Sequence, residues 1–154
     1  MAKIGHKAAA VLSEELGTAA IEFGLAIPLL LVVLMGIVEL GFAIYDGMQA
    51  YDAVEAGAIY AGKNGWSASG ISSAVTGATA TNGVTATPAP TEFWGCPNET
   101  GIATVPSSST TCTGGHAPGL YVRVNASITR STILPYPGLS LPTTITAKSV
   151  IRLN

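Results

Sequence analysis

The chain has 154 residues, of which 48% are hydrophobic and only 10% are charged, and its formal net charge is -2. An average soluble domain carries about 25% charged residues, so this deficit indicates a membrane segment, an assembly surface or a secreted protein. The chain has no cluster of its few Lys and Arg residues, and this excludes a nucleic-acid-binding protein, which needs a phosphate-neutralising patch.

The N-terminal part divides into a polar leader, residues 1–17, and a predicted long helix, residues 18–62, which is rich in Ala, Leu, Ile and Val. The uncharged run covers residues 23–38. About twenty helical residues span a bilayer core, so this run, extended through Glu39 to Tyr45, predicts a membrane span over residues 23–45. Pro28 lies inside the span and is expected to kink or locally loosen the helix. Polar side chains then return, so residues 46–62 are predicted to form an extracytoplasmic helical extension.

The charges that flank the apolar run predict its orientation. Lys3 and Lys7 precede it, whereas only Lys63 follows it closely, after several acidic residues. By the positive-inside rule, the N-terminus is expected in the cytoplasm and the C-terminal part outside it. A cleaved secretory signal is the alternative, but its apolar core spans only about seven to fifteen residues, so an uncleaved anchor fits this longer run better.

One stripe of the predicted helix consists mostly of small residues in its outer half. Alternating steps of three and four residues keep its members on one side of a helix: Ala26, Leu29, Val33, Gly36, Leu40, Ala43, Gly47, Ala50, Val54, Gly57 and Ala61. Small residues permit the close approach of another helix. The stripe's outer half can instead pack on the chain's own C-terminal domain, and the sequence leaves both interpretations open.

Residues 63–154 are predicted to form a small extracytoplasmic α+β domain. Residues 69–75 predict a short helix with Ile71 and Val75 turned inward, and two alternating runs near the C-terminus predict antiparallel strands joined by a long connection. We expect a sheet of three or four short strands. The expected core residues are Phe93, Trp94, Leu120, Val122, Val124, Ile128, Ile145 and Val150.

Both cysteines, Cys96 and Cys112, lie in the part of the chain that is rich in Gly, Ser, Thr and Pro. The polar surroundings favour a disulfide in an oxidising compartment over two unrelated buried thiols. In a domain this small, a disulfide that closes a loop of this length is worth about 3 kcal/mol in the chain-entropy model.

Two carboxylates lie near the ends of the apolar run. Glu22 is close to the N-terminal end, where the helix dipole favours an anion by about 0.3–1 kcal/mol. If the chain were cut after Gly17, the new ammonium of Thr18 would lie four residues from Glu22, and the two charges would neutralise each other. Glu22 could alternatively reach the ammonium of a neighbouring subunit. Glu39, about 25 Å further along, is expected to reach water where the span ends, with an inter-subunit contact as the alternative.

The stretch ELGTAAIEF, residues 15–23, resembles the processing site of type IV-like prepilins. In those proteins a peptidase cuts after a glycine, and a glutamate follows as the fifth mature residue beside an aromatic. The early proline, the outer Glu-Leu-Gly and the Ala/Gly/Tyr-rich extension make residues 13–62 similar to the TadE-like family of tight-adherence (Tad/Flp) pilus pseudopilins. Residues 119–154 resemble that family loosely. Many leaders of this type are basic before the glycine, whereas this one has Glu14 and Glu15.

The resemblance implies a minor pilin or pseudopilin that a prepilin peptidase cuts between Gly17 and Thr18, with Glu22 and Phe23 serving assembly. The implied partners are this peptidase, other pilin or pseudopilin subunits, an inner-membrane pilus assembly platform and membrane lipid. The implied location is the inner (cytoplasmic) membrane, as a single-pass protein with its C-terminal domain outside, and incorporation in a pilus. The expected fold is α+β, a lollipop in which a long N-terminal helix carries a small antiparallel β-sheet domain.

No residue pattern indicates catalysis. The two histidines, His6 and His116, fall on opposite sides of the membrane in this topology, and no zinc-ligand spacing, serine-nucleophile motif or phosphate-binding glycine loop is present. We therefore predict no enzyme, no metal and no cofactor. The alternative to a pilus component is a membrane-anchored extracytoplasmic binding domain that does not polymerise.

Overall fold

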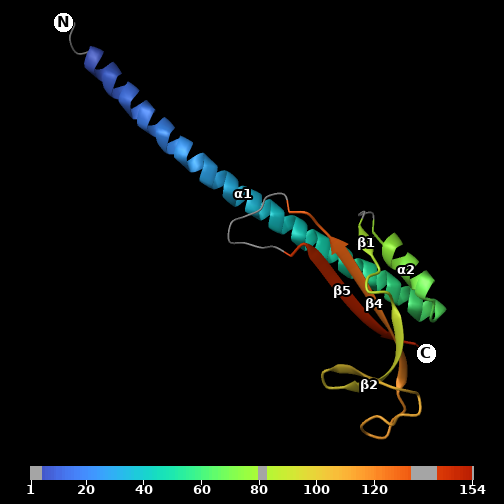
Figure 1. Cartoon of the computed structure of the whole chain (residues 1–154). Coiled ribbons are helices and arrows are strands. Elements are labelled where there is room, and N and C mark those ends of the chain that lie inside the picture. The colour runs from blue at the N-terminus through green and yellow to red at the C-terminus, as the bar shows by residue number, and fades with distance from the viewer. Residues whose placement is uncertain (1–4, 80–82, 133–141, 154) are drawn as a thin grey trace. The chain divides into compact units, whose positions relative to one another are not determined.

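Helix α1, Gly5–Asn64, is unbroken along its whole length and continues through Pro28 (Figure 1). The chain divides into two units within this helix, residues 1–41 and residues 42–154. The computed structural model describes the backbone of residues 5–79, 83–132 and 142–153, and the side chains from residue 18 onward in these ranges. A long N-terminal apolar helix is followed by an antiparallel sheet, which confirms the predicted α+β class.

The second unit contains the C-terminal part of α1 and the whole of a second helix, α2. The end of α1 is capped by Gly65, whose positive φ of 77° and N–H bond to the Ala61 carbonyl, at 2.9 Å, close the last turn. Helix α2, Ala68–Gly77, starts at Ser67, whose hydroxyl accepts a hydrogen bond from the Gly70 N–H. Ile71 and Val75 of α2 are fully buried, so the short helix and its inward face are confirmed.

The second unit contains five strands, all paired antiparallel: β1 Val84–Thr85, β2 Thr91–Asn98, β3 Gly101–Val105, β4 Gly119–Thr129 and β5 Thr144–Arg152. Strand β4 is central, with β5 along one edge and both β2 and β1 along the other. The antiparallel β4–β5 pair confirms the two predicted C-terminal strands. Most of the connection between them, residues 133–141, lies outside the described residues.

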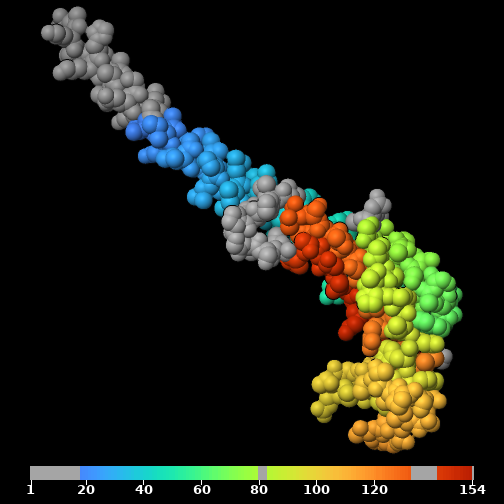
Figure 2. All heavy atoms as spheres, in the orientation of Figure 1, coloured from blue at the N-terminus to red at the C-terminus, as the bar shows by residue number. Residues whose placement is uncertain are grey.

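The sheet has five strands rather than the expected three or four, and the β2–β3 hairpin is among the strands that the sequence did not indicate. Its turn is held by Asn98, whose side-chain oxygen accepts hydrogen bonds from the N–H and the hydroxyl of Thr100, each at 3.0 Å. Gly101 follows with a φ of 140°. The hairpin and the loop after it, residues 106–118, form one end of the second unit (Figure 2).

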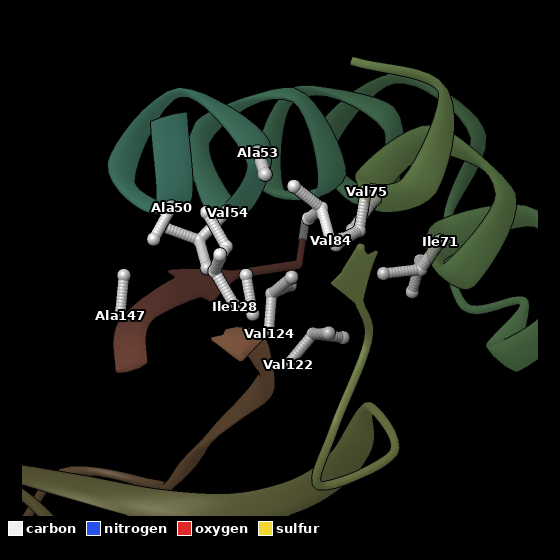
Figure 3. Close-up of a cluster of buried hydrophobic side chains, with 12 residues drawn as sticks. Ala50, Ala53, Val54, Ile71, Val75, Val84, Val122, Val124, Ile128 and Ala147 are labelled. Carbon is white, nitrogen blue, oxygen red and sulfur yellow. The ribbon is translucent and has the colours of Figure 1, made fainter. Parts of the chain in front are cut away.

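The hydrophobic core lies between the helices and one face of the sheet (Figure 3). In the small-residue stripe of α1, Ala50, Val54, Gly57 and Ala61 are all buried. Beneath them lie residues of α2, β1, β4 and β5, namely Ile71, Val75, Val84, Val122, Val124, Ala126, Ile128 and Ala147. The outer half of the stripe therefore packs on the chain's own domain, which was one of the two open interpretations.

Only part of the predicted core is correct. Val122, Val124 and Ile128 are buried in the cluster and Ile145 packs against it, whereas Phe93, Trp94 and Leu120 are half-buried. Val150 is 38% exposed, so its assignment was wrong. It pairs with Arg123 on the sheet face opposite the helices, while its neighbour Ile151 pairs with Val122 and packs on the core.

The opposite face of the sheet has its own aromatic contact. The rings of Phe93 and Tyr121 stack with their centroids 5.8 Å apart, and the guanidinium of Arg123 lies 4.7 Å from the centre of the Phe93 ring. Tyr121 is only 6% exposed as a result. Phe93, which was expected in the core, therefore packs on this opposite face, against a residue that strand alternation alone assigns to solvent.

A largely buried ion pair joins α1 to the residue after β4. The Arg130 Nε atom lies 3.4 Å from Asp46 Oδ2, with side chains only 6% and 16% exposed respectively. The backbone N–H of Arg130 also donates a hydrogen bond to the backbone carbonyl of Thr143, at 2.8 Å. Asp46 is the first charged residue after the predicted span. Its ion pair with Arg130 links helix α1 to the end of strand β4 within the second unit.

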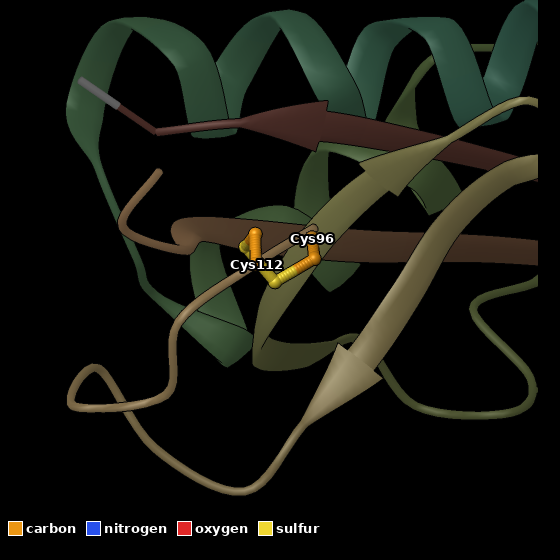
Figure 4. The surroundings of a disulfide bond; sticks show 2 residues. All are labelled: Cys96 and Cys112. Atoms are coloured by element: carbon orange, nitrogen blue, oxygen red, sulfur yellow. A yellow bond between two sulfur atoms is a disulfide. The ribbon is translucent and has the colours of Figure 1, made fainter. Parts of the chain in front are cut away.

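A disulfide joins Cys96 of β2 to Cys112 of the following loop, with Cα atoms 5.5 Å apart (Figure 4). The pairing is the one that the sequence led us to expect. Both cysteines are buried, at 8% and 7% exposure, yet they lie outside the hydrophobic cluster beneath the helices. The bond therefore fastens the loop rather than the core.

Replacing both cysteines by serine is expected to lower the free energy of unfolding by about 2 kcal/mol, the lower end of the usual range, because the core does not depend on this loop. Denaturant unfolding in detergent, followed by the fluorescence of Trp66 and Trp94, measures the loss. The wild-type chain under reducing conditions is the matched control and should unfold with the double variant. Equal stability of the oxidised wild type and the variant would contradict a stabilising bond.

Candidate processing site and assembly surface of helix α1

The peptide bond between Gly17 and Thr18 lies inside the regular helix α1, whose backbone continues on both sides of it. Glycine weakens a helix by about 1 kcal/mol relative to alanine, so Gly17 makes the helix locally easier to unwind. Thr18 is exposed. The scissile bond expected from the sequence thus lies in a helical segment that a peptidase must open locally.

Glu22 and Phe23 project from the first turns after this bond. Thr18 and Glu22 are four residues apart, and such pairs are neighbours on one helix face, with Cβ atoms about 6 Å apart. Glu22 is exposed, and the Phe23 side chain is 68% exposed. The helix brings the predicted site residues Gly17, Thr18, Glu22 and Phe23 into one short segment, with the Glu22 carboxylate one turn after Thr18.

The surface that follows is strongly apolar and is not covered by the unit to which it belongs. Many large side chains are about half to three-quarters exposed, among them Leu25 at 74%, Leu29 at 70% and Leu30 at 67%. One helix among the described residues, over Thr18–Asn64, is long and apolar enough to cross a membrane, and its most apolar window is not buried. So large an exposed apolar surface requires lipid or protein to cover it.

This apolar surface is not smooth. Phe23, Leu30 and Val33 surround the small residue Ala26 and, with two neighbours, line an open apolar groove of about 350 Å³ on one side of the helix. Gly24 and Gly41 have open space where a Cβ would lie. Small residues and open space of this kind permit the close approach of another helix.

Glu39 does not behave as expected. Its side chain is only 2% exposed, and it takes part in an interaction with another residue. The expectation that this carboxylate reaches water at the end of the span was therefore wrong. A carboxylate tolerates such burial only when its charge is compensated by a partner or neutralised by a proton.

The residues that the sequence singled out fall into two separate places, the segment from Gly17 to Phe23 and the Cys96–Cys112 disulfide. In the described part of the chain, no group of three or more His, Cys, Asp or Glu residues is arranged to hold a metal ion. A polar pocket beside the disulfide, with Arg152 in its lining, was not foreseen. No sequence signal marks it, because it depends on strand pairing.

Residues 17–58 match the family model described as TadE-like protein. No curated protein and no solved structure shows significant similarity to the chain. The match begins at the glycine of the expected processing site and extends through the apolar run into the core-forming part of α1. Residues 17–58 of this chain are therefore similar to the TadE-like family, the same family that the glycine, glutamate and phenylalanine of this segment resemble.

Proposed function

We propose that the chain is a minor pilin or pseudopilin of a tight-adherence (Flp-type) pilus system, cut after Gly17 by a prepilin peptidase. The observation that carries this proposal is the exposed apolar surface of α1 with the exposed carboxylate Glu22 near its start, five residues after Gly17. The TadE-like match covers this same segment, and the family is a structural one associated with pili. In this role Glu22 assists assembly and is not a catalytic group.

Cleavage would change the electrostatics of the helix start. A new N-terminus at Thr18 adds an ammonium to the end of the helix at which its dipole is already positive. Two buried charges of opposite sign near each other are far less costly in an apolar environment than either one alone. Glu22 is positioned to compensate the ammonium of its own chain or that of a neighbouring subunit. Removal of the leader would therefore make it less costly to bury Glu22 when helices of different subunits pack together.

The proposed location is the inner membrane, with the N-terminus in the cytoplasm and the second unit outside. The one apolar helix of sufficient length among the described residues fits a single-pass anchor, and Lys3 and Lys7 before it favour a cytoplasmic N-terminus by the positive-inside rule. The disulfide agrees with an oxidising compartment for the second unit. The proposed partners are the peptidase, other pilin subunits, the inner-membrane assembly platform and lipid, in a role in pilus biogenesis, adherence or secretion.

A membrane-anchored binding domain that does not polymerise is the second candidate. It is favoured by the polar pocket beside the disulfide, which is unrelated to helix packing. Such a protein would keep its N-terminal residues and would occur in membranes but not in detached filaments. The two candidates therefore differ in the mass of the mature chain.

Intact-mass spectrometry of the chain, isolated from cells that contain a prepilin peptidase, tests the proposal. We expect the mature protein to begin at Thr18. Cells with an inactivated peptidase provide the matched control, in which the leader should remain. A chain that begins at Met1 in both strains would rule out processing and favour the anchored binding domain.

A further inference from the structure

The sheet face turned away from the helices carries a pocket of about 410 Å³ beside the disulfide. Gly119 and Tyr121 of β4 and Arg152 of β5 line it on the sheet side, and Tyr121 pairs directly with Arg152. Cys112, Thr113 and His116 line it on the side of the loop. Its volume lies within the range of about 300–1,000 Å³ that is typical of small-molecule sites.

The loop side of the pocket is fastened in place. The Cys112 N–H donates to the His116 carbonyl at 2.9 Å, and the Gly115 N–H donates to the Cys112 carbonyl at 3.0 Å. Gly114 and Gly115 make this tight turn with φ values of 93° and 83°, which side-chain-bearing residues rarely adopt. Because the disulfide ties Cys112 to β2, the turn holds Thr113 and His116 at the pocket without a helix or strand beneath them.

Gly119 leaves room for Arg152 beside the pocket. A Cβ on Gly119 would lie 2.8 Å from Arg152 Nε and 3.0 Å from the Tyr121 ring, so a side chain at this position would displace the arginine. Arg123 lies on the Phe93 ring and Arg130 pairs with Asp46. Within the described residues, Arg152 has no carboxylate partner, and no acidic residue lines the pocket.

We infer that this pocket binds a small polyhydroxylated carboxylate, such as an acidic sugar, through the Arg152 guanidinium. An arginine binds a carboxylate through two parallel hydrogen bonds, and an exposed guanidinium without an internal partner is free to do so. Thr113 and His116 also line the pocket, and a hydroxyl and an imidazole are groups that can form hydrogen bonds with sugar hydroxyls. The inference does not depend on the proposed processing of α1.

Titration of the ¹⁵N-labelled full-length chain in detergent micelles with sodium glucuronate tests the inference. We expect saturable amide shifts confined to Thr113–Ala117, Gly119 and Tyr121. Glucose has the same ring without the charge and should bind about tenfold more weakly or worse, since the charged hydrogen bonds are lost. The absence of saturable shifts with glucuronate, or equal binding of glucose or inorganic phosphate, would overturn the assignment.

Two variants assign the binding to Arg152. Arg152→Gln should weaken glucuronate binding about tenfold or more, and Gly119→Ala should weaken it by displacing the guanidinium. Lys148→Gln is the matched control, since Lys148 is an exposed cation of the same strand that does not line the pocket. Its affinity should equal that of the wild type. Unchanged binding in Arg152→Gln, with amide spectra that show a folded chain, would overturn the inference, as would an equal loss in Lys148→Gln.

Discussion

A chain in which leucine replaces Gly17 is expected to keep its leader completely. Hydrolysis requires the Gly17–Thr18 bond to leave the helix, and leucine both stabilises the helix by about 0.5–1 kcal/mol and adds a bulky side chain at the bond. Gly24→Leu is the matched control, because Gly24 lies in the same helix with open space where its Cβ would be. Intact mass should show an uncut Gly17→Leu chain and a normally cut Gly24→Leu chain.

Glu22→Gln separates trimming from assembly in the same experiment. The variant chain should still begin at Thr18, but its share in sheared filaments should fall about tenfold or more, because the new ammonium loses its charged partner. Glu55→Gln removes an exposed carboxylate elsewhere on α1 and should assemble normally. Normal trimming of Gly17→Leu would contradict the proposed cleavage site, and normal filament content of Glu22→Gln would contradict the proposed role of the carboxylate.

Gly57→Ala is expected to destabilise the second unit by about 3 kcal/mol, the upper end of the usual range for overpacking. A Cβ at this position would lie 2.7 Å from a methyl group of Val124 and 2.7 Å from a methyl group of Val75. Helix α1 would therefore have to move away from both the sheet and α2. Gly57→Leu should have a larger effect still and prevent the core from closing.

Gly47→Ala is the matched control, and its expected change in the free energy of unfolding has the opposite sign. Gly47 lies ten residues earlier in the same helix, and nothing is within 4 Å of its added Cβ. The substitution should stabilise the chain by up to about 1 kcal/mol through helix propensity alone. Denaturant unfolding followed by Trp66 and Trp94 fluorescence, both in the second unit, measures each variant. Equal effects of the two substitutions would contradict the close packing seen at Gly57.

The elements with strong local periodicity could be predicted from the sequence. The long apolar run predicted α1, Ile71 and Val75 predicted the buried face of α2, and the alternation from Leu120 onward predicted β4 and its core side. In α1 and β4 the pattern repeats over several turns or strand positions, and in α2 the two apolar residues are four apart, so the local signal is sufficient. The class of fold followed from these elements alone.

The features that depend on pairing between distant residues could not be predicted. The β2–β3 hairpin is rich in Gly, Thr and Pro, a composition shared with loops, and only its pairing with β4 identifies it. Val150 was placed in the core because the apolar residues of β5 are not evenly spaced, and the register with β4 reverses that choice. The pocket beside the disulfide requires Gly119, Arg152 and a loop residue to meet, which no local pattern encodes.

The surface that packs against the small-residue stripe could not be predicted from the sequence. The spacing correctly identified a helix side that permits close contact, but composition cannot say which surface approaches it. At Gly57 the approaching atoms belong to Val124 and Val75 of the same chain, whereas at Gly47 the space around a Cβ is empty. Gly47 and Gly57 belong to one stripe but have different environments, and this difference is visible only in the three-dimensional structure.

The burial of α1 residues in the core has a practical consequence for recombinant production of the second unit. A fragment that begins at residue 63 would lack Ala50, Ala53, Val54 and Ala61, four of the twelve residues of the buried cluster, and would expose the apolar underside of the sheet to solvent. A fragment that begins at Phe42 keeps all twelve and omits residues 18–41, which hold most of the apolar run. A fragment intended to contain the intact core therefore retains residues 42–64 of the first helix.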